Sequence, residues 1–304
     1  MSEGSPRGKL SFADPRVFIP FGIVSLIWGS TWLVIRDQIS VVPPSWTITY
    51  RFALASAAML VLLAIRRERP WVAKEGLPVV LIVAMTQFVM NFHFVYRAEL
   101  TLTSGIVALF FALIMIPNSI LAWFVLRERV SPGFVAGSAI AIAGVAMLLI
   151  HEYRLAASGE GITAGVAFAA TATGSAAVAN VTQASERAHA QPFLPLLTLS
   201  MIAGTTINLV LALVLDGPPV WDSRVEYGLG LAYLGIVGSV VTFSLYFTLI
   251  RNMGAGRAAY VGVITPILAM LLSTLFESYV WTPLAMGGAV LALIGLVLAL
   301  KARH

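Results

Sequence analysis

Two amides and an aromatic ring recur at helical spacing inside one uncharged stretch of the chain, at Gln87, Asn91 and Phe94. Residues three and four positions apart share one face of an α-helix. An amide offers hydrogen-bond donors and an acceptor, and an aromatic face attracts ammonium groups. This combination suits recognition of a small neutral or zwitterionic solute better than it suits bond-breaking chemistry.

Polar and aromatic side chains in other uncharged stretches could extend the same lining. They are Trp28, Ser30, Trp32, His93, Tyr96, Thr171, Ser175, Asn180, Thr242, Tyr246 and Tyr260. An unpaired amide is costly in apolar surroundings, so all the amides in these stretches, Asn118 and Asn208 included, are expected to face inward. Each polar group could instead join neighbouring helices by hydrogen bonds, and that packing role is favoured for His93. The two tryptophans could also be interfacial anchors.

Catalytic groups are sparse. The histidines at positions 93, 151, 189 and 304 are scattered, cysteine is absent, and the acids Asp37, Glu99, Glu128 and Glu277 stand at the ends of apolar runs. Hydrolytic chemistry needs paired acids, a nucleophile with its base, or a set of metal ligands. We therefore predict that the chain is not an enzyme and uses neither a metal nor another cofactor.

The composition sets the environment of these candidate residues. Of 304 residues, 59% are hydrophobic and only 11% are charged, and the mean hydropathy is +0.91. A soluble domain carries about 25% charged residues. Most of this surface must therefore face lipid, and membrane lipid is the expected partner. The net charge of +5 comes from basic residues beside apolar runs and is not evidence for nucleic acid.

Ten apolar stretches are long enough to cross a bilayer, which takes about 20 residues of helix. They are Val17–Ile35, Val41–Ile65, Leu77–Tyr96, Leu100–Leu126, Val130–Ile150, Gly161–Ser185, Ala190–Leu215, Tyr227–Ile250, Ala258–Phe276 and Ser278–Leu300. Lipid leaves the backbone no outside hydrogen-bond partner, and these runs do not alternate as barrel strands do. The sequence predicts an all-α polytopic membrane protein with ten transmembrane helices.

Basic residues predict the orientation. Most of the 19 Lys and Arg residues would lie on the side of the N-terminus, and basic loops stay in the cytoplasm. We expect both termini there, in a bacterial inner membrane. The predicted parts are a cytoplasmic tail (1–16), a first five-helix repeat (17–150), a linker (151–160) and a second five-helix repeat (161–301). The chain is expected to work as a monomer.

The two halves share a pattern. Pro117 precedes Glu128 by 11 residues and Pro266 precedes Glu277 by 11, at an offset of 149 between the halves, and a glycine-rich stretch follows each acid. An odd number of helices per half inserts the second half upside down, as in many secondary transporters. A proline inside a helix frees a carbonyl and bends the helix. We predict two inverted repeats around a central cavity, with matched hinges at Pro117 and Pro266.

Charged residues inside the predicted spans are few. Arg51 and Arg97 are interpreted as residues near the outer boundary that anchor to headgroups or to Glu99. Proton-driven pumps keep an acid within the membrane despite its cost of about 2.5–3.5 kcal/mol. Because no such acid stands well inside a span, we expect a facilitator that moves its solute down a gradient.

The stretch LIWGSTWLVIRDQISVVPPSWTITYRFALASAAML resembles the first two helices of EamA-type exporters of the drug/metabolite transporter superfamily. Trp28-Gly29-Ser30 and Arg51 carry the resemblance there, and the paired Pro and Glu segments match the end of each half. The resemblance covers essentially the whole chain, although the sixth span, GVAFAATATGS, lacks the WGS-like start. Overall, the chain is similar to YddG-type aromatic amino-acid exporters.

The resemblance implies a basket of helices around a cavity that passes small metabolites outward by alternating access. Amino acids, aromatic or otherwise neutral, are the preferred solutes. An exporter of organic cations of the methyl viologen type is the alternative, and an intramembrane enzyme is the alternative from another class.

Overall fold

The computed structural model describes residues 14–126, 131–155, 161–253 and 261–302. Eight helical segments within those ranges are long and apolar enough to cross a membrane, from Pro15–Gln38 to Val225–Tyr246. Two shorter apolar helices, Ile264–Phe276 and Pro283–Ala299, fall on the ninth and tenth predicted spans. The chain is thus an all-helical integral membrane protein over the part described, and the total of ten spans stays a prediction.

The helices of the first half are α1 (Pro15–Gln38), α2 (Pro44–Arg66), α3 (Leu77–Val83), α4 (Phe92–Ala98), α5 (Ser104–Ala112), α6 (Met115–Leu126) and α7 (Pro132–Leu155). Those of the second half are α8 (Ile162–Gln183), α9 (Glu186–His189), α10 (Phe193–Leu215), α11 (Val225–Ala232), α12 (Thr242–Met253), α14 (Val261–Phe276) and α15 (Pro283–Ala302). A short 3₁₀ turn, η1 (Lys74–Gly76), precedes α3. Helix α7 extends past residue 150 into the predicted linker.

Proline begins four of the long helices, at Pro15, Pro44, Pro132 and Pro283. The first position of a helix tolerates proline because its N–H has no intrahelical partner anyway. A hydroxyl caps the start of two of them. Ser131 Oγ accepts from the Phe134 N–H at 3.1 Å, and Thr282 Oγ1 accepts from the Ala285 N–H at 3.2 Å.

Two π-helical segments interrupt otherwise α-helical spans. Segment η2 (Ala84–Asn91) joins α3 to α4, and η3 (Tyr233–Val241) joins α11 to α12. They begin 149 residues apart, which is the offset between the proline-to-glutamate segments. A π-helical turn within an α-helix is rare and frequently marks a functional site.

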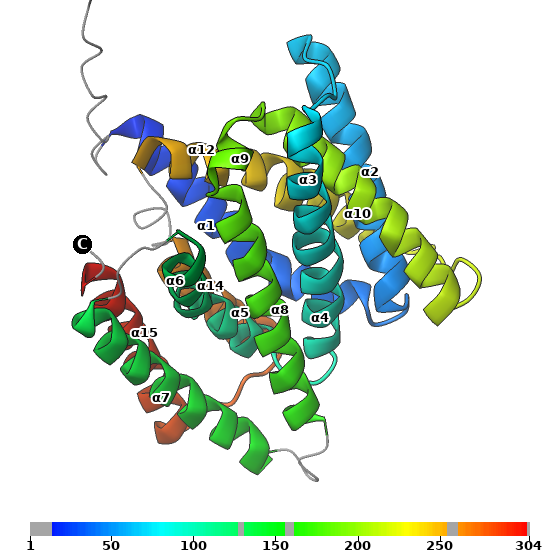
Figure 1. Ribbon diagram of the computed structural model, residues 1–304. Coiled ribbons are helices and arrows are strands. Elements are labelled where there is room, and N and C mark those ends of the chain that lie inside the picture. The colour runs from blue at the N-terminus through cyan, green and yellow to red at the C-terminus, as the bar shows by residue number, and fades with distance from the viewer. Residues whose placement is uncertain (1–13, 127–130, 156–160, 254–260, 303–304) are drawn as a thin grey trace, which may run out of the picture.

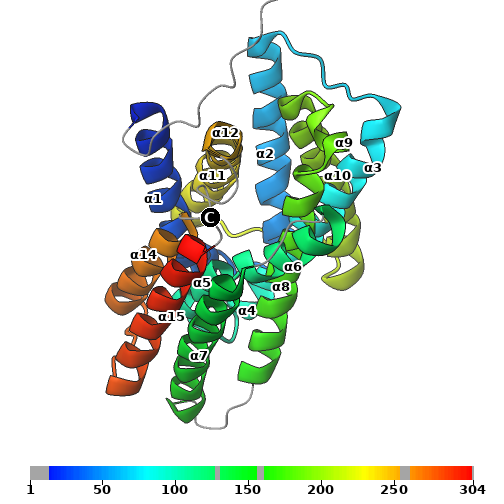
Figure 2. The ribbon, with the colours of Figure 1, turned by 60° about the vertical axis from the view of Figure 1, so that its left-hand side comes forward.

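Contacts between helices correspond in the two halves. Helix α2 packs on η3 as α10 packs on η2, and α1 packs on α12 as α8 packs on α4. Figure 2 shows α1, α11 and α12 gathered on one side and α3, α9 and α10 on the other. The main hydrophobic core lies among α2, the third span, α5 and α10.

Helices α7 and α15 form a close glycine interface and lie side by side in Figures 1 and 2. A Cβ added at Gly144 would lie 2.2 Å from the Ala292 nitrogen, and one added at Gly295 would lie 2.2 Å from the Ala141 nitrogen. Gly137 in turn faces Ala299. Residue numbers rise along α7 as they fall along α15, so the two helices run antiparallel.

Candidate functional site

A cavity of about 450 Å³ lies between the helices of the two halves. Its polar and aromatic lining consists of Trp28, Thr31, Trp32, Arg51, Gln87, Asn91, Phe92, Phe111, Asn118, Asn180, Gln183, His189, Phe193, Phe243, Tyr246 and Thr265. It extends from the buried Ile35 and Val95 to the exposed Ala184 and His189 at the end near α9. This volume and a mainly apolar wall with a few polar groups are typical of small-molecule sites.

Among the described residues, six of the predicted pathway residues line this cavity: Trp28, Trp32, Gln87, Asn91, Asn180 and Tyr246. Trp28 packs on Tyr246 with ring centroids 4.9 Å apart, and its indole N–H donates to Thr242 Oγ1 at 3.0 Å. Thr242 is fully buried behind that tryptophan and does not line the cavity. Its side chain therefore orients Trp28.

The two amides of the predicted face line the cavity, but its aromatic residue, Phe94, does not, because the helix is π-helical in this segment. Gln87 and Asn91 lie in η2 and line the cavity, whereas the face continues through Phe92 and Val95 and not through Phe94. A π turn holds more residues than an α turn, so the 3.6-residue period used for the prediction does not hold here. Phe94 instead stacks on Phe168 of α8 at 5.9 Å.

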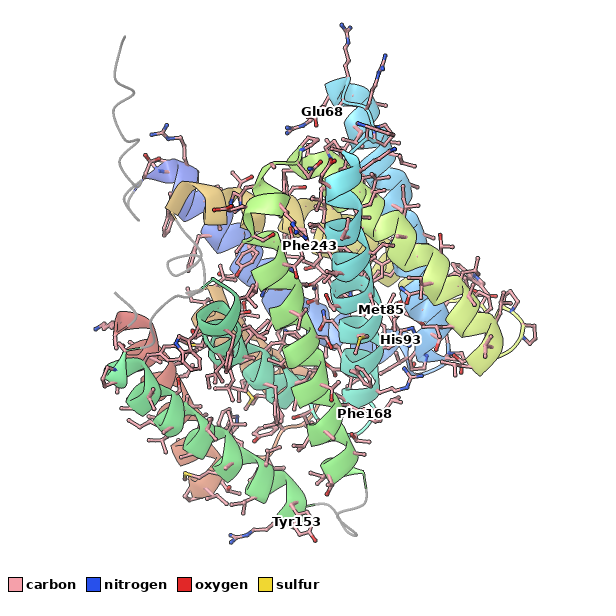
Figure 3. All side chains as sticks on the ribbon, viewed as in Figure 1. Glu68, Met85, His93, Tyr153, Phe168 and Phe243 are labelled. Carbon is pink, nitrogen blue, oxygen red and sulfur yellow. The ribbon has the colours of Figure 1, made fainter. Side chains whose placement is uncertain are left out.

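His93 and Tyr96 point away from the cavity into the packed interior. His93 lies on the side of its helix toward α10 (Figure 3), where its Nε2 is 3.2 Å from Asn208 Oδ1. Arg97 approaches His93 Nδ1 at 2.9 Å. Tyr96 is fully buried, and its hydroxyl accepts from Arg51 at 3.3 Å. His93 thus joins neighbouring helices and side chains by hydrogen bonds, which is the role favoured for it in the sequence analysis.

The other three Ser and Thr residues on the predicted list, besides Thr242, also lie outside the lining. Thr171 and Ser175 donate to carbonyls one turn earlier, at Ala167 and Thr171. Ser30 lies 2.6 Å from the Tyr233 hydroxyl. A helical Ser or Thr can satisfy its hydroxyl on its own backbone, so it need not face a polar site. Tyr260 lies outside the described residues.

The two matched prolines have different surroundings. Pro266 lies inside the continuous helix α14 and lines the cavity. Pro117 lies in the first turn of α6, and the span is broken just before it, between Ala112 of α5 and Met115. A helix break one turn before a proline is the expected effect of the lost N–H. Hinge motion at either position stays a prediction.

Arg51 is not at the outer boundary, which corrects its interpretation as a headgroup anchor. Its side chain is 3% exposed and lines the cavity. Helix α2 begins at Pro44, so Arg51 lies about two turns inside it. A hydropathy profile gives only approximate ends for a span, so it did not show how far inside the helix Arg51 lies. Asn118, an amide expected to face inward, lines the cavity. Phe243 and Thr265 are lining residues outside the predicted set, because residues far apart in sequence give no sign that they meet in the fold.

A buried carboxyl pair lies at the other end of the bundle from Ala184 and His189. Ser104 Oγ is 3.0 Å from Glu99 Oε2 and 2.7 Å from Glu277 Oε1. Arg36 Nε is 3.4 Å from Glu277 Oε1, and Arg36 also donates to the Glu99 and Leu102 carbonyls. We call Arg36, Glu99, Ser104 and Glu277 the carboxyl cluster. It joins the starts and ends of α1, α4, α5 and α14.

This geometry favours the protonated form of Glu99. One serine hydroxyl carries one proton, so it can donate to only one of its two carboxyl neighbours. Glu99 lies in the connection after the third span, where burial first and the charge of Glu277 second raise its pKa well above the usual value. Two nearby carboxylates with one arginine resist double ionisation. Glu99 thus holds a proton to higher pH than an exposed glutamate does.

Comparison with known proteins gives consistent matches along the chain. The model of the EamA-like transporter family matches residues 19–150 and 163–301. Protein PagO of Salmonella typhimurium is 26% identical over 294 residues, covering 95% of this chain and 94% of that protein. A probable amino-acid metabolite efflux pump of Escherichia coli K12 is 25% identical over 285 residues, covering 90% and 91%. One crystal structure aligns with a TM-score of 0.68 at 21% identity, covering 94% of this chain and 96% of its own, and so shares the fold.

Proposed function

The chain belongs to the EamA-like transporter family, as its sequence resemblance indicated, and we propose that it exports small amphipathic metabolites, amino acids above all, by alternating access. The observation that carries the proposal is the cavity of about 450 Å³ among the helices of both halves. Relatives described as probable amino-acid metabolite efflux pumps support the solute class.

The two halves are inverted repeats in this proposal. The antiparallel packing of α7 on α15 supports it, since these helices occupy equivalent places in the two halves. The matched π-helical segments and the paired contacts of α2 and α10 support it as well. Such halves can exchange inward and outward shapes at nearly equal energy.

The cavity in this structure opens toward the cytoplasm in our proposal. Glu68, after α2, and Tyr153, near the end of α7, lie at opposite ends of the molecule (Figure 3). Arg66, Arg67 and Arg69 flank Glu68, and a basic end favours the cytoplasm. Under that orientation the carboxyl cluster closes the outer end, both termini are cytoplasmic, and the membrane is a bacterial inner membrane.

The driving force is the gradient of the solute itself, so the protein acts as a facilitator. No Asp or Glu occurs among the described residues that line the cavity. A proton-coupled antiporter usually holds such an acid where the solute binds. Transport in proteoliposomes without a pH gradient is expected, and an absolute requirement for that gradient would contradict this part of the proposal.

The amides of η2 are expected to contact the solute. We expect Gln87→Ala and Asn91→Ala each to lower amino-acid flux about fivefold, because each removes about 1 kcal/mol of hydrogen bonding to the solute. The measurement is counterflow in proteoliposomes with labelled aromatic, aliphatic and hydroxy amino acids and methyl viologen. The quantity of folded protein, followed by size exclusion, should not change.

Thr206→Ala is the matched control for the amide variants. Thr206 is exposed, donates to the Ile202 carbonyl in its own helix and does not line the cavity. Its flux should equal that of the unchanged protein. Full activity in both amide variants would contradict the assignment of η2 to the solute pathway.

The aromatic lining favours one second candidate, an exporter of organic cations. Trp28, Phe243 and Tyr246 surround one part of the cavity. The ring centroid of Trp28 lies 5.8 Å from that of Phe243 and 4.9 Å from that of Tyr246. Aromatic faces attract cations. Counterflow of methyl viologen without any amino acid would favour this candidate.

A further inference from the structure

Arg51 is a buried cation that has no acidic partner among the described residues. Its Nε donates to Ser239 Oγ at 3.2 Å, and its two terminal nitrogens donate to the Tyr96 hydroxyl at 3.3 Å and the Gly238 carbonyl at 3.5 Å. All three acceptors are neutral. The described ion pairs belong to other arginines, at positions 16, 36 and 224. The positive charge of Arg51 is therefore uncompensated within that part of the chain.

The burial of this charge calls for an anion. A buried ion is costly unless an opposite charge and hydrogen bonds replace its water. Guanidinium carries five N–H donors, and the three contacts above use one on each nitrogen, which leaves two on the terminal nitrogens. Two donors side by side on a planar fork match the oxygens of a carboxylate.

Neighbouring rings hold the guanidinium in place. Its central carbon lies 4.6 Å from the centre of the Phe92 ring and 5.5 Å from that of Phe52. With Ser239 and Tyr96 these rings fix the side chain before any ligand arrives. Pre-organised groups lose little entropy on binding. The site is thus built from α2, α4 and η3, the elements that correspond across the two halves.

Two other residues that line the cavity each carry a buried polar atom with no hydrogen-bond partner among the described residues. These atoms are the acceptor Asn91 Oδ1 and the donor Trp32 Nε1. Orphaned buried polar groups are uncommon in native structures and call for an explanation. A zwitterion supplies a partner for each kind of group, since its carboxylate accepts and its ammonium donates.

We propose that Arg51 binds the carboxylate of the transported solute, with Asn91 Oδ1 receiving its ammonium group. This inference rests on the proposed export function and narrows it to solutes that carry a carboxylate. The same arginine repels a dication such as methyl viologen, so this inference disfavours binding of organic cations in the cavity.

The test compares one solute with and without its carboxylate. Phenylalanine and phenylalaninamide differ only in that group, and each is measured as a competitor of labelled phenylalanine uptake in proteoliposomes. The unchanged protein should prefer the acid by at least about tenfold, the gain of a charge-assisted bond. Arg51→Gln should bring the ratio to about one, and Arg51→Lys should leave it at an intermediate value.

Arg97→Gln is the matched control, because Arg97 lies on the third span, contacts His93 and does not line the cavity. Its acid-to-amide ratio should be unchanged. A purely structural Arg51 would lower uptake in Arg51→Gln while the competitor ratio stayed the same, and that result would overturn the inference. If Arg51→Gln does not fold, an unchanged ratio in Arg51→Lys overturns it equally.

The outcomes separate this inference from the proposed function. Methyl viologen uptake without amino-acid uptake by the unchanged protein would contradict the proposed function itself. Amino-acid uptake in which acid and amide compete equally would contradict only the role of Arg51. Phenylalanine is replaced by the best solute of the counterflow screen if another amino acid is preferred there.

Discussion

Gly144→Ala is expected to destabilise the protein by about 3 kcal/mol, the upper part of the usual cost of overpacking. The new methyl carbon would lie 2.2 Å from the Ala292 nitrogen and 2.6 Å from the Gly288 carbonyl oxygen. Both are backbone atoms and cannot rotate away, so α7 and α15 must separate. The measurement is the melting temperature in detergent, together with the fraction of monodisperse protein after size exclusion.

The equivalent change in the other half gives an internal comparison. Gly295→Ala places a methyl carbon 2.2 Å from the Ala141 nitrogen and 2.7 Å from the Gly137 carbonyl oxygen, so its effect should equal that of Gly144→Ala. Gly174→Ala is the control, because a Cβ there meets no atom of the described residues within 4 Å. Alanine suits a helix better than glycine, so this control should keep or slightly raise the melting temperature. Equal melting temperatures for all three variants would contradict the packing of α7 on α15.

The eight long spans among the described residues each fall on a predicted run, because lipid imposes a long, uncharged run on every helix that crosses it. Helix α10 (Phe193–Leu215) lies within the predicted Ala190–Leu215, and α8 lies within Gly161–Ser185. The offset of 149 found between Pro117 and Pro266 reappears in the two π-helical segments. The repeat in the sequence thus corresponds to a matched pair of local structures, one in each half.

The site was harder to predict, for reasons that differ between residues. Phe94 was misplaced because the helical period changes within η2, and Thr171 because its hydroxyl binds its own backbone. The carboxyl cluster was missed because Glu99 and Glu277 are far apart in sequence and each one stands at a run end. A run end suggests exposure, yet the ends of four helices meet there and bury both acids.

The carboxyl cluster predicts a pH-dependent stability. The folded state binds the Glu99 proton more tightly than the unfolded state does, because burial and Glu277 raise the pKa of Glu99. The stabilisation is therefore complete below the ordinary glutamate pKa of 4.5 and is lost as the pH rises through the raised value. Each pKa unit of difference corresponds to about 1.4 kcal/mol, or a fall of roughly 3 °C in melting temperature.

Glu99→Gln tests that prediction, since glutamine keeps the shape of protonated glutamate and does not titrate. The melting temperature of the unchanged protein should fall between mildly acidic and alkaline pH, whereas that of Glu99→Gln should fall less. Glu75→Gln, at an exposed glutamate in η1, should retain the full dependence. The same dependence of melting temperature on pH in all three proteins would show that Glu99 is not protonated in the folded state.

Loss of the Glu99 proton should also loosen the two spans that carry Pro117 and Pro266, because Ser104 begins α5 and Glu277 follows α14. Alkaline pH is therefore expected to favour opening of the bundle at the end that holds the carboxyl cluster.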